Sequence, residues 1–146
     1  MIDTFRMYAQ EHLSRNASDW EVLLLAQHHR LPTRLLDWTL SLFVALFFAT
    51  ENTAKWDKDG IIWCVSRLET TKLLPVELQV ILKNNKSTLF SLEILQNHFP
   101  SLVQFDDGPK PTLIWFEPPS INPRIINQYA LFSVMTGVET SQTEYF

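Results

Sequence analysis

Glycine is scarce in this sequence of 146 residues, where it occurs only as Gly60, Gly108 and Gly137. These three glycines lie too far apart to form the phosphate-binding Walker loop or the glycine-rich fingerprint of dinucleotide-binding folds. The sequence therefore excludes the commonest nucleotide-binding folds.

Long basic runs and long apolar runs are also missing. The net charge is −4 and Lys and Arg are not clustered, whereas a phosphate backbone is bound by such clusters. We therefore do not expect a nucleic-acid partner. The longest apolar run, residues 42–49, is far shorter than the roughly 20 residues that cross a bilayer, and the N-terminus does not resemble a signal peptide. These features predict a soluble, cytoplasmic protein without a membrane partner.

The sequence contains one cysteine, Cys64, so an internal disulfide is excluded. Cys64 lies within an apolar stretch, residues 61–66, that follows the turn residues 57–60 and is typical of a buried strand. We expect a buried, inert thiol in a reducing compartment.

The size and composition are typical of one globular domain. Hydrophobic residues make up 46% of the chain and charged residues only 19%, a low surface charge that suits an oligomer or a piece of a larger assembly. The pattern predicts an α+β domain with a small mixed or antiparallel sheet. We expect helices over residues 3–13, 18–31, 40–50, 76–83 and 89–98, and strands over residues 33–38, 61–66, 112–117 and 131–136.

Two of these helices carry the clearest signals. Ser18 and Glu21 have the spacing of a capping box, which fixes the start of one helix, and Pro32 ends it. Residues 40–50 are apolar on every face of a helix. A helix of this kind is normally buried on all sides, so we expect the other helices to pack around it as a central element.

Polar chemistry is concentrated in one stretch, "LAQHHRLPTRLLDW", residues 25–38. Arg offers a planar fork for phosphate or carboxylate, Trp a stacking face, and amide, imidazole and hydroxyl groups offer hydrogen bonds to a ribose. The same groups could serve the fold instead, because helix ends need polar partners. Arg34 and Asp37 could form an ion pair, or, if the segment is extended, point to opposite sides.

Other kinds of site have little support. His28 and His29 are adjacent and diverge on a helix, and His12 and His98 belong to no metal-ligand spacing, so no metal is expected. No serine lies in a glycine-flanked elbow, and Cys64 is expected to be buried, so nucleophilic catalysis is not indicated.

The stretch "WEVLLLAQHHRLPTRLLDWTLSLFVALFFAT", residues 20–50, closely resembles the signature of the FRG domain family. A later stretch, "PRIINQYALFSV", is similar to the family's second signature, with Arg124, Ile125, Gln128 and Phe132 at the expected places. The chain departs from the family pattern at Arg30 and Ala130, which replace glycines, and at Leu42, which replaces a proline. The naming Phe-Arg-Gly motif is not matched by residues 5–7, so we expect residues 1–146 to be a single FRG-like domain truncated at both ends.

The FRG layout is similar to that of ADP-ribosyltransferases, which use NAD. The resemblance implies an ADP-ribosyltransferase-like fold, NAD as a cofactor, and Gln128 at the catalytic position. An amide cannot act as a base, so we expect weak or absent turnover. The candidate ligand-binding residues are Gln27, His28, His29, Thr33, Arg34, Asp37, Trp38, Thr39, Ser41 and Arg124.

Three interpretations stay open at this point. The first is an ADP-ribosyltransferase-like domain of a bacterial or phage conflict system, acting on NAD or a related nucleotide. The second is a non-catalytic or degenerate module that binds a nucleotide-like small molecule, a protein partner or a second copy of itself. The third gives the polar cluster a purely structural role, in which case removal of Arg34 or Asp37 should cost several kcal/mol, as for one partner of a buried pair.

Overall fold

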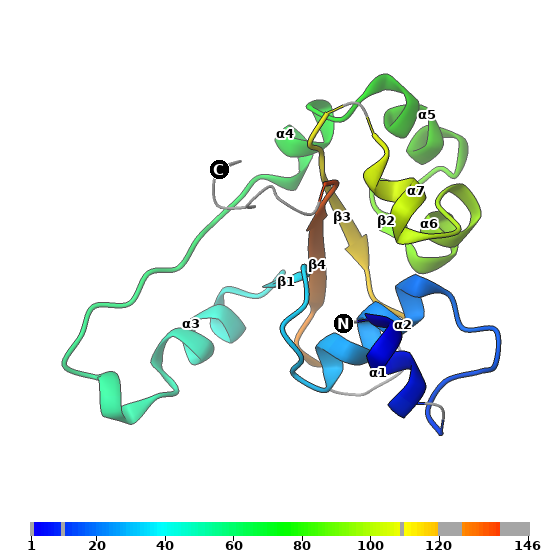
Figure 1. The fold of residues 1–146 in the computed structure, drawn as a ribbon. Coiled ribbons are helices and arrows are strands. Elements are labelled where there is room, and N and C mark those ends of the chain that lie inside the picture. Colours follow the sequence, from blue (N-terminus) through cyan, green and yellow to red (C-terminus); the bar gives the residue numbers. More distant parts are fainter. Residues whose placement is uncertain (1, 10, 109, 120–126, 138–146) are drawn as a thin grey trace.

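A computed structural model describes residues 2–9, 11–108, 110–119 and 127–137. The elements, in chain order, are α1 (Ile2–Tyr8), α2 (Asp19–His28), β1 (Leu36–Thr39), α3 (Leu42–Thr50), the short 3-10 helix η1 (Thr53–Lys55), α4 (Arg67–Lys72), α5 (Val76–Asn84), β2 (Phe90–Ser91), α6 (Leu92–His98), α7 (Leu102–Asp106), β3 (Leu113–Glu117) and β4 (Ala130–Met135) (Figure 1). The predicted α+β class is confirmed.

The four strands form one mixed sheet in the order β1-β4-β3-β2. β4 pairs antiparallel with β1 on one side and with β3 on the other, and the short β2 pairs parallel with β3. Because β4 runs against both neighbours, the ends of β1 and β3 meet the start of β4 at one edge of the sheet. The candidate site described below lies at this edge.

Side chains alternate across β3 and separate two hydrophobic clusters. Ile114 and Phe116 point into the main core, which α2, α5, α6 and α7 cover (Figure 1). Leu113 and Trp115 point to the opposite face and pack in a smaller cluster. There the indole Nε1 of Trp115 donates to Thr70 Oγ1 of α4, at 2.8 Å.

Helix α2 is the buried helix of this fold. The predicted capping box is confirmed: Ser18 accepts from the Glu21 amide, and the Glu21 carboxylate accepts from the Ser18 amide at 2.8 Å. Trp20 lies within the first turn and is fully buried, and its Nε1 donates to the Phe99 carbonyl at 2.8 Å. The start of α2 therefore anchors the main core.

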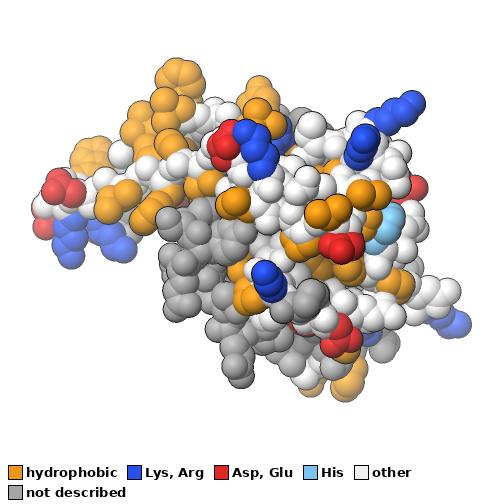
Figure 2. All heavy atoms as spheres, turned by 90° about the horizontal axis from the view of Figure 1, so that it is seen from above, with side chains coloured by type: hydrophobic (Ala, Val, Ile, Leu, Met, Phe, Trp, Pro, Cys, Tyr) orange, Lys and Arg blue, Asp and Glu red, His pale blue; other side chains and the backbone are white. Residues whose placement is uncertain are grey.

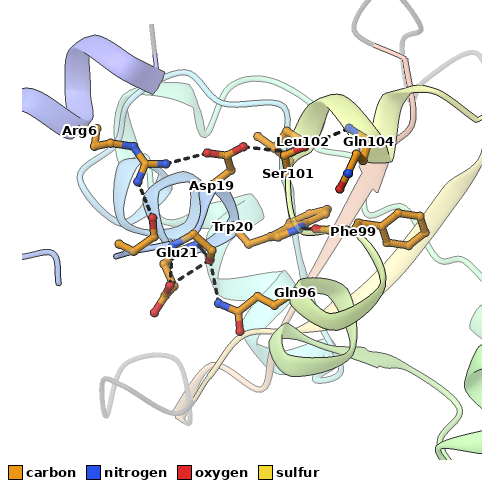
Figure 3. Close-up of polar contacts among 11 residues, drawn as sticks. Arg6, Asp19, Trp20, Glu21, Gln96, Phe99, Ser101, Leu102 and Gln104 are labelled. Carbon is orange, nitrogen blue, oxygen red and sulfur yellow. Dashed lines mark hydrogen bonds and ion pairs between the residues drawn. The ribbon is translucent and has the colours of Figure 1, made fainter. Parts of the chain in front are cut away.

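A polar network ties α2 to three other helices (Figure 3). Arg6 of α1 forms an ion pair with Asp19 at 2.7 Å, and the Asp19 carboxylate also accepts from the Leu102 amide at the start of α7. Gln96 of α6 donates to the Ser18 hydroxyl at 2.7 Å. These contacts fix the end of α2 opposite the candidate site.

The prediction of a buried central helix at residues 40–50 is wrong. Helix α3 contains no buried residue and projects from the sheet on the side away from α5, α6 and α7 (Figure 1). It belongs to a segment, residues 40–66, that runs out from β1 through α3 and η1 and returns to α4 as extended chain; we call this segment the arm. Its apolar composition predicted burial, but the body of the domain covers only one of its sides.

The predicted buried strand at residues 61–66 is also corrected. This part of the arm pairs with no strand among the described residues, and Ile61, Trp63 and Cys64 are exposed. The Cys64 thiol, which was expected to be buried, is therefore exposed. Residues of high β-propensity form a strand only where a neighbouring strand is available for pairing. Here the chain leaves the sheet before residue 61.

The other helix and strand predictions are confirmed with shifted boundaries, and the helix predicted at residues 3–13 ends at Tyr8. α5, β3 and β4 lie close to the expected residues, and the predicted helix at 89–98 begins later, because Phe90 and Ser91 form β2. The strand predicted at residues 33–38 is β1, displaced toward the C-terminus. Two short helices, α4 and α7, were not predicted, since each spans six residues or fewer and shows little periodicity.

Candidate functional site

A groove of about 1640 Å³ lies at the edge of the sheet where β1 and β3 end and β4 begins. The C-terminal end of α2 forms one side of the groove and the arm forms the other. Pro118 and Pro119, which follow β3, contribute to the lining. The groove is therefore built from segments that are far apart in the sequence.

The arm supplies an apolar wall. Val44, Ala45, Phe48 and Ala49 line the groove from one face of α3, and residues 61–63 line it from the returning chain. Positions 44, 45, 48 and 49 share one side of a helix because they are spaced by one turn. Planar aromatic faces are thus available along this wall.

Gln27 is the centre of the polar side. Its Nε2 donates to Asp37 Oδ2 at 2.6 Å, and its Oε1 accepts a short hydrogen bond from the Thr33 hydroxyl. The Thr33 hydroxyl also accepts from the Leu35 amide at 3.1 Å. All three polar residues line the groove, so the last turn of α2 and the segment before β1 present an amide, a hydroxyl and a carboxylate together.

Thr39 and Gln128 join the two strands at the floor of the groove. The Thr39 hydroxyl donates to the Gln128 carbonyl at 2.7 Å and accepts from the Ser41 amide at 3.0 Å. Both Thr39 and Gln128 line the groove, and Ser41 lies outside the lining. Ser41 instead caps α3, since its hydroxyl accepts from the Val44 amide at 3.4 Å.

Three histidines line one end of the groove. The ring of His29 lies 6.0 Å from that of His12 and 5.4 Å from that of His28, measured between centroids. His28 is the last residue of α2 and His29 is its C-cap. Among the described residues no group of three His, Cys, Asp or Glu could hold a metal ion.

Trp38 has a structural role in addition to its place in the lining. Its Nε1 donates to Ser133 Oγ at 2.8 Å, and its ring packs edge-on against Trp115 at 5.0 Å between centroids. Trp38 is therefore held by the second hydrophobic cluster, and presents part of its surface to the groove.

Arg34 lies outside the groove lining. Its guanidinium binds both oxygens of Asp106, at 2.8 and 2.7 Å, and donates to the Met135 carbonyl. The hypothesis of an ion pair with Asp37 is wrong, whereas the alternative, that Arg34 and Asp37 have different surroundings, is confirmed. Partial burial raises the pKa of Asp106, but hydrogen bonds from Arg34 and the Gly137 amide, together with the charge of Arg34, outweigh it and hold the pKa below its ordinary value.

The sequence identified most of the polar side of the groove but not its other parts. Asp106, the partner of Arg34, and the lining residues at 61–63 and 118–119 were not predicted. No local signal could have found them, because they meet the cluster only through the chain topology. Arg124, a predicted ligand-binding residue, lies outside the described residues.

The fold and the groove define a small α+β domain with an open, mainly apolar groove at a sheet edge. Residues 1–58 match the model of the FRG domain family, which confirms the resemblance to that family. The match covers α1, α2, β1, α3 and η1, and with them most of the residues that line the groove. No curated protein and no solved structure matches the chain.

None of the described helices combines the length and the apolar character that crossing a membrane requires.

Proposed function

We propose that this FRG domain binds a nucleotide-type ligand in the groove, with NAD as the first candidate. One observation carries the proposal: the Gln27–Asp37 pair faces an apolar, aromatic wall across a single groove. A nucleotide site needs both kinds of surface, because the ribose hydroxyls form hydrogen bonds with polar groups and the base packs against planar apolar faces.

The dimensions and chemistry of the groove suit a dinucleotide. Ligand pockets for smaller molecules typically enclose about 300–1,000 Å³, and this groove is larger, at about 1640 Å³. The carboxylate of Asp37 accepts from Gln27, and because each carboxylate oxygen offers two lone pairs it can also accept from a ribose hydroxyl. Phe48 and Trp63 supply aromatic faces on the opposite wall.

Group transfer at this groove would involve Asp37 rather than Gln128. In ADP-ribosyl transfer the bond from ribose to nicotinamide breaks with its electron pair on nicotinamide, and an acceptor nucleophile forms the new bond and releases a proton. The amide of Gln128 cannot take that proton, whereas a carboxylate can. We therefore propose that Asp37 orients the ligand and accepts the proton in any transfer reaction.

The test is thermal unfolding with and without millimolar NAD, with ADP-ribose and AMP as smaller probes. A ligand at ten times its Kd adds about 1.4 kcal/mol, which raises Tm by roughly 3–6 °C in a domain of this size. In Asp37→Asn the ligand should bind about tenfold more weakly, because a hydrogen bond to a charged acceptor is lost.

The matched control is Asp107→Asn, which removes the same charge from an exposed position outside the groove lining. This variant should respond to NAD as the wild-type chain does. Unchanged Tm values with all three probes would overturn the proposal, as would an equal loss of binding in both variants.

A further inference from the structure

Helix α3 has two apolar faces, and the groove accounts for only one of them. The face opposite the groove consists of Leu42, Phe43, Leu46 and Phe47, whose exposed fractions are 65%, 82%, 49% and 60%. These positions recur with the spacing of one helical turn, so they form a continuous ridge. We call this ridge the outer face of α3.

We infer that two copies of this chain associate through the outer faces of their α3 helices. The helix contains no charged residue, so a matching surface must also be apolar and uncharged. A second outer face satisfies this condition by itself. In an antiparallel, two-fold arrangement each ridge packs against the other, and the N-terminal end of each helix lies beside the C-terminal end of its partner, where the dipoles attract.

The outer face of α3 is of the size of a small, reversible interface. Phe43 and Phe47 are 82% and 60% exposed, and at about 200 Å² for a complete aromatic side chain they expose roughly 280 Å². Leu42 and Leu46 add to this area, whereas Phe48, Ile61 and Trp63 line the groove and are not counted. The total is below the ~800 Å² that each partner buries in a standard interface, and so fits a dimer that forms reversibly with concentration.

The distribution of charge favours a second copy over a lipid surface. Figure 2 shows hydrophobic side chains gathered along the arm, with charged side chains at its tip. A helix that lies on a membrane combines its apolar face with a strongly polar, Lys- and Arg-rich face, and α3 has no such face. Outside the arm, Leu68 of α4 is 62% exposed but has charged neighbours in Arg67 and Glu69.

Pairing would also help to hold the apolar wall of the groove in place. α3 forms the apolar wall of the groove with one face and would meet the partner copy with the other. The outer face of the helix would then be covered, and the position of α3 relative to β1 would be set by the partner as well as by the body of the same chain. The inference does not depend on which ligand the groove binds.

Sedimentation velocity of the full chain over about 1–200 µM tests the inference. We expect a concentration-dependent dimer for the wild-type chain and a monomer for Phe47→Glu, because two buried carboxylates would face each other. A mixture of Phe47→Glu with Phe47→Lys should regain a one-to-one dimer. The control is Val103→Glu, at a position of α7 that is 70% exposed, and it should dimerise as the wild type does.

The alternative occupants give different results. The inference would be overturned if the wild-type chain stayed monomeric at all concentrations, whether or not it bound neutral phosphatidylcholine vesicles. A dimer that Phe47→Glu leaves intact would also overturn it. Folding of each variant is checked by its melting curve, which should resemble that of the monomeric fraction of the wild type, since Phe47 is 60% exposed and contributes little to the core.

Discussion

The guanidinium of Arg34 and the carboxylate of Asp106 form a two-pronged ion pair with N–O distances of 2.8 and 2.7 Å. The two residues lie 72 positions apart, in the segment before β1 and at the end of α7, and both side chains are about one-fifth exposed. The guanidinium also lies over the Phe105 ring, at 5.8 Å from its centroid. This pair joins the groove-bearing edge strand to the helical layer and gives Arg34 a structural role.

Arg34→Ala should lower the free energy of unfolding by about 2–3 kcal/mol, because it leaves a partly buried carboxylate without its charged partner. Arg34→Lys should cost less but not be neutral, since an ammonium cannot bind both oxygens in the same plane. Urea unfolding measures both. The exposed pair Lys72–Glu69 provides the control: Lys72→Ala should cost about 0.5 kcal/mol or less. Equal stabilities of Arg34→Ala and the wild type would contradict the structural role.

Acid should weaken the domain through Asp106. Its pKa is lowered in the folded state, so the folded chain holds this proton less tightly than the unfolded chain does. The stabilisation is therefore complete above the ordinary Asp pKa of about 3.9 and is lost as the pH falls through the lower folded value. In Asp106→Asn the free energy of unfolding should fall less steeply below about pH 4. Asp107→Asn, at the exposed neighbouring position, should keep the wild-type slope.

Local sequence signals predicted those parts of the fold that local interactions determine. The capping box at Ser18 and Glu21 predicted the start of α2, and short, nearly continuous apolar runs predicted β3 and β4. The polar side of the groove was also predictable, since Gln27 and Asp37 are separated by only ten positions. Contacts such as Arg34–Asp106 depend on the topology, which a single sequence does not reveal.

The failed prediction for α3 shows what hydrophobicity can and cannot indicate. An apolar helix predicts that its faces will be covered, but it does not say by which surface. The inner face, with Val44 and Phe48, lines the groove, while the outer face, with Phe43 and Phe47, is exposed in a single copy. The inferred pairing of two copies would take the outer face out of water and leave the inner face on the groove.

Arg30 offers a way to stabilise the end of α2. Its φ is 61°, and the Arg30 and Leu31 amides donate to the carbonyls of Gln27 and Ala26, at 2.9 and 3.0 Å. This is a Schellman motif with an arginine in the left-handed position that glycine normally takes. Arg30→Gly should therefore raise the free energy of unfolding by about 1 kcal/mol. Arg30→Ala is the control and should bring no such gain, because alanine has the same Cβ clash. A loss of stability in Arg30→Gly would show that the arginine side chain makes a compensating contact.

Cys64 reports directly on the arm. The thiol is exposed in the returning chain, between Trp63 and Val65, so Ellman's reagent should modify it in the native protein. Exposure controls thiol reactivity, and we expect native and urea-unfolded rates within roughly tenfold of each other, in the wild type and in the Phe47→Glu variant. A buried strand at residues 61–66, as the sequence alone predicts, would instead require unfolding before reaction and slow modification by orders of magnitude. The ratio of the two rates therefore decides between an arm that projects from the domain and one that is folded into its core.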